Sequence, residues 1–204
     1  MTLTADALWL NSFFSGYDTD ILSFAHRLAE IAGSVLTPFN RIITLLGEKG
    51  LLFLLLALVF MLFPRWRRTG VCIFGAVCCG ALITNIILKD LIARPRPYDF
   101  DATMREWWVF AGSHFESDYC FPSGHMNAAC AFTSGFVFTR GKKWLPWGLL
   151  YVVLMGISRN FLIVHYPSDI VGGFIFGTCA GLISWLIIKA VYKKWGQSKL
   201  LREE

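Results

Sequence analysis

The chain alternates long apolar stretches with short polar turns. The apolar stretches of helical length cover residues 21–46, 50–63, 70–88, 121–138, 144–157 and 167–192. A helix needs about 20 mainly apolar residues to cross the hydrocarbon core of a bilayer. The pattern therefore predicts an all-α fold, a polytopic membrane bundle of about six transmembrane helices.

The start of the chain fits this pattern least well. His26 and Arg27 interrupt the beginning of the first apolar stretch, and Pro38 interrupts its middle. The second stretch is short for a span. One of the two is therefore expected to be a tilted or partial helix, and whether the first one fully crosses the membrane stays open. Residues 1–20 include Trp9, a residue type typical of the headgroup layer, and are expected to form an interfacial N-terminal segment.

Composition narrows the class of protein. Of the 204 residues, 55% are hydrophobic and 16% are charged, which is too apolar for a typical soluble domain. No internal repeat or linker divides the chain, so residues 1–204 are expected to form one domain. The six cysteines include no Cys-x-x-Cys pair, and neither a disulfide framework nor a metal site is predicted.

The basic residues indicate how the bundle is oriented. The formal net charge is +5, but the positive residues concentrate in short turns beside the apolar stretches, so nucleic-acid binding is not expected. These basic segments are residues 64–70, 139–144 and 193–204. The positive-inside rule places all three in the cytoplasm, including the C-terminal tail. The other turns, including the long loop 98–121, are then extracytoplasmic.

Charged residues and histidines converge on that extracytoplasmic end. Taken singly, each has an ordinary explanation: Lys89, Arg94 and Arg96 are of the type that anchors a helix end in the headgroups. His125 fits a structural loop residue, and Asp169 fits a helix cap. These explanations do not account for basic residues gathering on the face where the positive-inside rule predicts fewest of them. A shared functional site is the alternative.

The residue types suit the binding of phosphate. Lys89, Arg96 and Arg159 together would present about three positive charges, with point and forked donors that match phosphoryl oxygens. Ser123 adds a hydroxyl at the start of a predicted helix, where free N–H groups bind anions. The sequence therefore predicts an anion site.

Two histidines and a carboxylate add catalytic chemistry. One histidine can attack phosphorus as a neutral imidazole, and the other can protonate the leaving oxygen. Asp169 follows His165 by four residues, so on a helical turn it reaches the ring N–H and fixes the tautomer.

These residues resemble the signature of the type 2 phosphatidate phosphatase superfamily. Its first part, Lys-x6-Arg-Pro, matches residues 89–97, and its second, Pro-Ser-Gly-His, matches residues 122–125. The third part, Ser-Arg-x5-His-x3-Asp, matches residues 158–169. Three motifs in the family's order, all on one side of the membrane, form a specific signal.

The resemblance implies a metal-independent phosphatase without a cofactor, which works through a phosphohistidine. His165 would be the nucleophile, Asp169 its orienting partner and His125 the general acid. The residues implied to bind the phosphoryl group are Lys89, Arg96, Ser123, Gly124 and Arg159. Arg94 lies outside the signature, and we expect it either to support the site from behind or to contact a headgroup.

The resemblance leaves the substrate open among lipid phosphates. The family acts on undecaprenyl diphosphate, phosphatidylglycerol phosphate and phosphatidate, and the chain is similar to small bacterial members, the phosphatidylglycerophosphate phosphatases B and undecaprenyl-diphosphate phosphatases. We expect a multi-pass protein of a bacterial plasma membrane, active in phospholipid or cell wall metabolism. Its expected partners are the lipid substrate and the bilayer, with no obligatory protein partner. A transporter of organic anions or lipid phosphates, or a non-catalytic binding protein, would use the same cationic site.

The loop 98–121 mixes acidic and aromatic residues and has two interpretations. It can be an interfacial aromatic belt with solvated acids. It can also be a rim over the site, with Trp107 and Trp108 in the headgroups. The acidic residues would then repel soluble anionic substrates. His114, in the same loop, is not expected to be catalytic.

Overall fold

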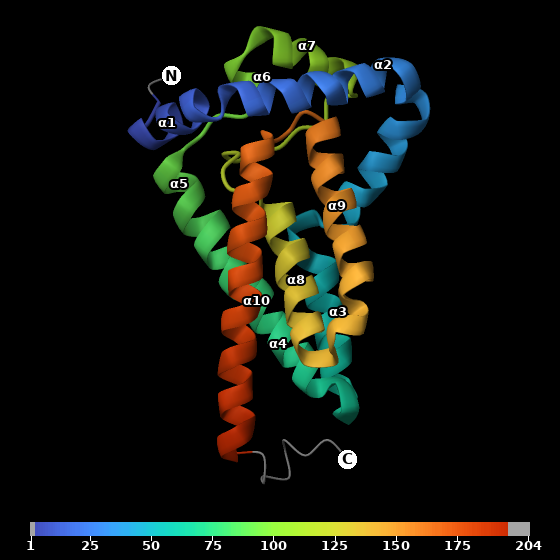
Figure 1. The fold of residues 1–204 in the computed structure, drawn as a ribbon, viewed down its shortest axis with the longest axis vertical. Helices are drawn as coiled ribbons and strands as arrows, with labels where there is room; N and C mark the ends of the chain where they lie inside the picture. The colour runs from blue at the N-terminus through green and yellow to red at the C-terminus, as the bar shows by residue number, and fades with distance from the viewer. Residues whose placement is uncertain (1–2, 196–204) are drawn as a thin grey trace.

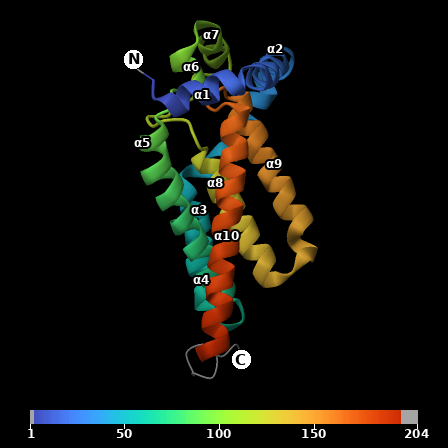
Figure 2. The same cartoon turned by 60° about the vertical axis from the view of Figure 1, so that its left-hand side comes forward.

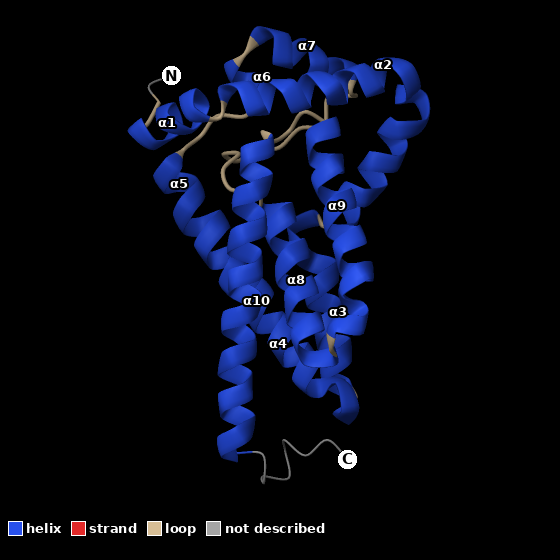
Figure 3. Cartoon of the chain, viewed as in Figure 1, coloured by secondary structure: helices blue, strands red, loops and turns tan. Residues whose placement is uncertain are grey.

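The computed structural model describes residues 3–195, and within that range it contains helices and no strand (Figure 3). The main bundle consists of α3 (Leu51–Leu62), α4 (Pro64–Ala81), α8 (Gly124–Arg140), α9 (Leu145–Phe161) and α10 (Pro167–Trp195). One end of the bundle is covered by α1 (Ala5–Phe13), the first half of α2 (Ser15–Leu46), α6 (Pro97–Phe100) and α7 (Ala102–Phe110), as Figure 1 shows. We call these covering segments, residues 5–31 and 97–110, the cap layer.

Helix α2 changes direction within the first apolar stretch. Ala32 has φ −139° and ψ 24°, which lies outside the helical region. Before this residue α2 runs across the end of the bundle, and after it the helix descends beside α9 (Figures 1 and 2). The first apolar stretch is therefore not one straight helix, and the part that holds His26 and Arg27 lies in the cap layer.

The third apolar stretch forms one long helical segment. Helix α4 continues through a π-helical segment, Leu82–Leu88, into the short α5 (Lys89–Ile92). Ala93 ends the segment with a left-handed φ of 51°. Such π-helical turns occur frequently at functional sites, and this one leads directly into Lys89.

Helix α8 lies at the centre of the bundle because small residues let its neighbours approach closely. It packs against α4, α9 and α10. Gly173, Gly177 and Gly181 recur every four residues on the side of α10 that faces α8. A Cβ atom at Gly177 would lie only 2.3 Å from the backbone oxygen of Asn127. This spacing of small residues permits the close helix contacts common in membrane bundles, and it joins the two helices that carry His125 and Asp169.

The outer surface of the bundle suits a bilayer. Three segments are long and apolar enough to cross a membrane, namely Ser15–Leu62, Pro64–Phe100 and Pro167–Lys194. Helices α8 and α9 have 17 residues each, at the short end of the range for a span. Large apolar side chains such as Leu62 and Ile86 are exposed on the outside. The helical membrane fold is confirmed, and the number of six spans stays a prediction.

Candidate active site

The predicted site residues lie at the end of the bundle beneath the cap layer. Lys89 begins α5, Ser123 precedes the first residue of α8, and Arg159 lies in the last turn of α9. His165 lies in the turn between α9 and α10. The predicted side chains that are buried, with at most 8% of their surface exposed, are Lys89, Arg96, Ser123, His125, Arg159, His165 and Asp169.

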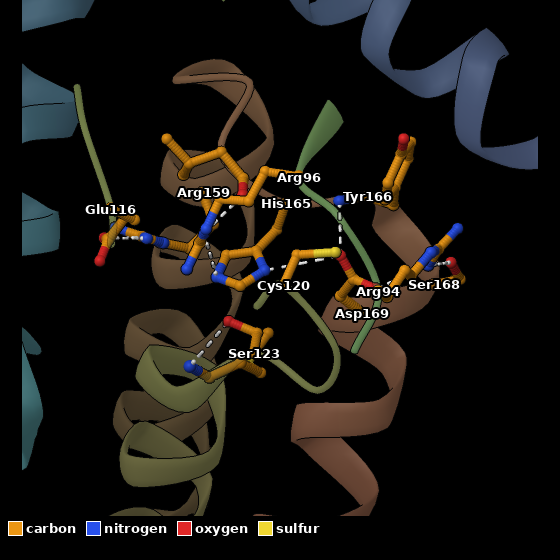
Figure 4. A network of polar contacts seen from close by, with 12 residues as sticks. Arg94, Arg96, Glu116, Cys120, Ser123, Arg159, His165, Tyr166, Ser168 and Asp169 are labelled. Carbon is orange, nitrogen blue, oxygen red and sulfur yellow. Dashed lines mark hydrogen bonds and ion pairs between the residues drawn. The ribbon is translucent and has the colours of Figure 1, made fainter. Parts of the chain in front are cut away.

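His165 is held between a cation and a carboxylate (Figure 4). Its Nε2 lies 3.4 Å from Nη1 of Arg96, a group that can only donate. Its Nδ1 lies 3.5 Å from Oδ2 of Asp169, longer than a hydrogen bond. Because Nε2 faces a donor and Nδ1 faces an acceptor, the favoured tautomer carries its proton on Nδ1. The Nε2 lone pair is then directed toward the cationic side chains.

Burial keeps His165 neutral. Desolvation, followed by the nearby charges of Arg96, Arg159 and Lys89, lowers the pKa of His165 well below its ordinary value. A neutral imidazole is the nucleophilic form of histidine. The environment of the ring therefore maintains the nucleophilic form of His165.

The carboxylate of Asp169 is fixed by hydrogen bonds on both oxygens. Oδ2 accepts the backbone N–H of Tyr166 at 2.8 Å, and Oδ1 accepts Nη1 of Arg94 at 2.6 Å. The backbone carbonyl of Asp169 accepts the N–H of Ser123 at 3.1 Å. The beginning of α10 is thereby attached to the beginning of α8.

The N-terminus of α8 supplies the second motif. Ser123 is the N-cap residue, and its Oγ is 3.5 Å from the N–H of Met126, a long contact that leaves the hydroxyl available to another partner. A Cβ atom at Gly124 would lie 2.7 Å from Oδ1 of Asn85, so glycine allows this approach. His125 places Nε2 at 3.3 Å from Oε2 of Glu48. The free N–H groups of this helix N-terminus are of the kind that can bind an anion.

Carboxylates occupy the donors of the three predicted phosphate-binding cations, Lys89, Arg96 and Arg159, which we call the cationic cluster. Asp118 accepts from both Lys89 and Arg96, and Glu116 accepts from Arg159. Both acids come from the loop 98–121. Their oxygens stand where phosphoryl oxygens would be bound.

The charges of the cluster keep these two acids ionised. Burial alone would raise the pKa of Asp118, but the charge and hydrogen bond of Lys89 and the charge of Arg96 hold that pKa below its ordinary value. Burial would likewise raise the pKa of Glu116, yet the hydrogen bond from His114 and the charge of Arg159 lower it. The sequence interpretation missed both partners. The signal available was that several buried cations need counter-charges.

A cavity of about 730 Å³ adjoins the cluster. It is lined by Asp90, Pro95, Arg96, Asp99 and the segment 115–119. The loop 98–121 thus forms a wall of the space beside the site.

Among residues 3–195, no three His, Cys, Asp or Glu side chains are grouped to hold a metal ion.

The tryptophans of the loop pack against protein groups. Trp108 stacks on Tyr98 with ring centroids 4.6 Å apart, and its Nε1–H donates to the carbonyl of His114 at 2.8 Å. Trp107 stacks on His26 of α2 at 5.2 Å. These contacts fasten the loop to the cap layer, so the interpretation of a rim over the site describes the loop better than a belt of solvated acids.

Arg94 does not reach a headgroup. Its side chain is fully buried and donates to Asp169 and to Asp18 of α2. The expectation of a headgroup contact was wrong, because the left-handed turn at Ala93 directs the chain inward beneath the cap layer. The alternative, support of the site from behind, describes Arg94 correctly.

Comparisons with known proteins identify the family and the fold. The sequence model described as the PAP2 superfamily matches residues 69–193. Phosphatidylglycerophosphatase B of Bacillus subtilis is 32% identical over 74% of this chain and 73% of that protein. Lipid A 1-phosphatase of Rhizobium johnstonii is 32% identical over 62% of this chain and 50% of that protein, so the match spans about half of that relative. A crystal structure of a transmembrane PAP2-type phosphatidylglycerolphosphate phosphatase from Bacillus subtilis has the same fold, with a TM-score of 0.57 and 23% identity over 94% of this chain and 98% of that one.

Proposed function

The chain belongs to the PAP2 superfamily, and we propose that it is a membrane phosphatase that removes phosphate from a lipid phosphate or isoprenoid diphosphate through a phosphohistidine. The observation that carries this proposal is the setting of His165, with Nε2 toward Arg96 and Nδ1 toward Asp169. A neutral imidazole with its lone pair directed at a cationic site is equipped to attack a bound phosphoryl group. The contact to Asp169, 3.5 Å in the structure, would tighten as positive charge develops on the ring.

Substrate binding would exchange one set of anionic oxygens for another. The phosphoryl oxygens would take the donors of the cationic cluster that Glu116 and Asp118 occupy in the structure. The hydroxyl of Ser123 and the amide of Gly124 would complete the site. Donors fixed in advance stabilise the charge that spreads over the oxygens in the transition state.

The reaction would proceed in two displacements. Nε2 of His165 forms a bond to phosphorus while the bond from phosphorus to the lipid oxygen breaks, and His125 gives its proton to that oxygen. Asp169 stabilises the positive charge on the phosphorylated ring. Water then attacks phosphorus, His125 takes a proton from the water, and the N–P bond breaks. Inorganic phosphate leaves, and His165 is neutral again.

The arrangement of charge supports an extracytoplasmic site. The basic turns 64–70 and 139–144 lie at the far end of the bundle from the cap layer (Figure 1). By the positive-inside rule the far end is cytoplasmic. A lipid phosphate of the outer leaflet would then enter at the depth of its headgroup.

The position of the charges also favours hydrolysis over transport. A transporter binds its substrate near the bilayer midplane, on broken helices from related halves. The cationic cluster instead lies at helix ends, and the sequence has no internal repeat. A transporter or a binding protein would also need neither of the two predicted catalytic histidines, and this chain has both His125 and His165.

Phosphate release tests the proposal and ranks the substrates. The purified protein in detergent would be given undecaprenyl diphosphate, phosphatidylglycerol phosphate, phosphatidate and the soluble glycerol 3-phosphate. We expect release from at least one lipid, none after His165→Ala, and near-normal release after His26→Phe, which removes an imidazole of the cap layer but keeps an aromatic ring beside Trp107. The absence of release from every lipid, or full activity of His165→Ala, would contradict the proposal.

A further inference from the structure

Arg94 is a buried cation outside the signature motifs, and its donors are already engaged. Nη1 donates to Oδ1 of Asp169 at 2.6 Å and to Oγ of Ser168 at 2.8 Å. Nη2 donates to Oδ2 of Asp18 at 2.9 Å, and Nε donates to Oδ1 of Asn11 at 2.8 Å. A guanidinium has five N–H donors, and four of them point at these acceptors. Arg94 is therefore directed away from the phosphate-binding donors and toward the back of Asp169 (Figure 4).

Asp18 holds the opposite side of the guanidinium. It lies in the first turn of α2, in the cap layer, and only 2% of its surface is exposed. Its Oδ1 accepts the backbone N–H of Ser168 at 2.8 Å, and its Oδ2 accepts the hydroxyl of Ser168 at 2.7 Å. Asp18 thus binds both Arg94 and the first turn of α10, although it lies far outside the stretch matched by the family.

The ring of Tyr166 encloses this group of charges. The guanidinium carbon of Arg94 lies 4.0 Å from the ring centroid, a distance typical of a cation–π contact. The backbone N–H of Tyr166 donates to Oδ2 of Asp169. The carboxylate of Asp169 is thereby held from two directions, and its Oδ2 remains turned toward His165.

We propose that Arg94 and Asp18 are positioning residues for the phosphoryl transfer, an inference that rests on the proposed function. Arg94 fixes the carboxylate of Asp169 and keeps it charged, and Asp18 fixes Arg94. The result is that the proton of His165 stays on Nδ1 and the Nε2 lone pair stays toward phosphorus. A buried carboxylate without this cation would carry an uncompensated charge, which is strongly unfavourable.

This role predicts a loss of turnover with substrate binding preserved. In metal sites, partners that hold a ligand side chain from behind are typically worth about 10- to 100-fold in activity, and we expect a similar magnitude for the groups that hold Asp169. We expect Arg94→Gln to lower kcat about 100-fold and Asp18→Asn about 10-fold, with KM and the affinity for inorganic phosphate changed less than about twofold. Arg94→Lys keeps the charge and some donors, so it should retain more activity than Arg94→Gln.

The experiment compares kcat, KM and the binding of inorganic phosphate, a ground-state anion, in these variants with two exposed controls. Arg27→Gln and Asp20→Asn remove the same groups from exposed positions of α2 and should leave all three values unchanged. Retained phosphate binding shows that a variant is folded, including Asp18→Asn, whose side chain keeps its shape. If Arg94→Gln kept normal kcat, or if kcat and phosphate affinity fell together, the positioning role would be wrong. An inactive wild-type protein would instead overturn the proposed function and, with it, this inference.

Discussion

Substitution of Gly177 by alanine tests whether the contact between α8 and α10 sets the geometry of the site. A Cβ atom there would lie 2.3 Å from the backbone oxygen of Asn127 and 2.8 Å from the Cβ of Cys130. Ordinary contact begins at 3.4 Å, so the two helices would have to separate by about 1 Å. Neither neighbouring atom is the end of a flexible side chain, so a change of rotamer does not relieve the clash.

The separation acts on the chemistry because the two helices carry different parts of it. His125 lies in the first turn of α8, and Asp169 lies in the first turn of α10. A shift of about 1 Å at an active site can lower the rate about 10²-fold, which corresponds to about 2.7 kcal/mol in the barrier. Overpacking also destabilises a fold by about 1–3 kcal/mol. We therefore expect Gly177→Ala to lose both turnover and thermal stability.

The assay is kcat for phosphate release together with thermal unfolding in detergent. Gly16→Ala is the matched control, because it is also a helical glycine and a Cβ atom there would meet nothing within 4 Å. We expect the control to unfold at the wild-type temperature or above it, with unchanged kcat. Normal kcat in Gly177→Ala, or an equal loss in Gly16→Ala, would refute the link between helix packing and the site.

Three further results are expected. Phosphate release should persist in EDTA because the cationic cluster supplies positive charge, and a strict need for an added divalent metal would contradict this. The lowered pKa of His165 keeps its imidazole neutral when the pH is lowered through about 6.5. A plot of kcat/KM against pH should therefore show no loss of activity with a midpoint at or above about pH 6.5. The same pKa shift makes the folded state less stable at low pH, because the histidine of the unfolded chain binds the proton first. Glu116→Gln removes an anion that competes for Arg159. The pair is largely buried and therefore worth more than the about 1 kcal/mol of an exposed pair, so orthovanadate should bind at least about fivefold tighter; unchanged or weaker binding would contradict the competition.

The sequence predicted the helical membrane fold and the gathering of the motif residues. Both follow from local information: apolar stretches of the length of a span, and polar residues that recur at the same side of successive turns. The close contact of α8 with α10 was also readable, since Gly173, Gly177 and Gly181 are spaced by four residues, but the sequence interpretation did not use it.

Other features depend on contacts between distant parts of the chain. The bend at Ala32 is an exception, because Gly33 and Ser34 follow it directly and helices often kink at such a pair. The ion pair of Arg94 with Asp18 joins residues 76 positions apart, and the pairing of Glu116 with Arg159 depends on how the loop 98–121 folds back over the bundle. Charge alone indicated that such partners were needed, while only the tertiary arrangement identifies them.

Trapping the phosphoenzyme tests the central claim most directly. The purified protein would be mixed with a lipid phosphate that carries a radiolabelled terminal phosphate, quenched in alkaline detergent during turnover, and mapped by peptide. We predict label on His165 that is stable to alkali and labile to acid, and no label in His165→Ala. Phosphate release by wild-type protein without label on His165, or with label on another residue, would contradict the account.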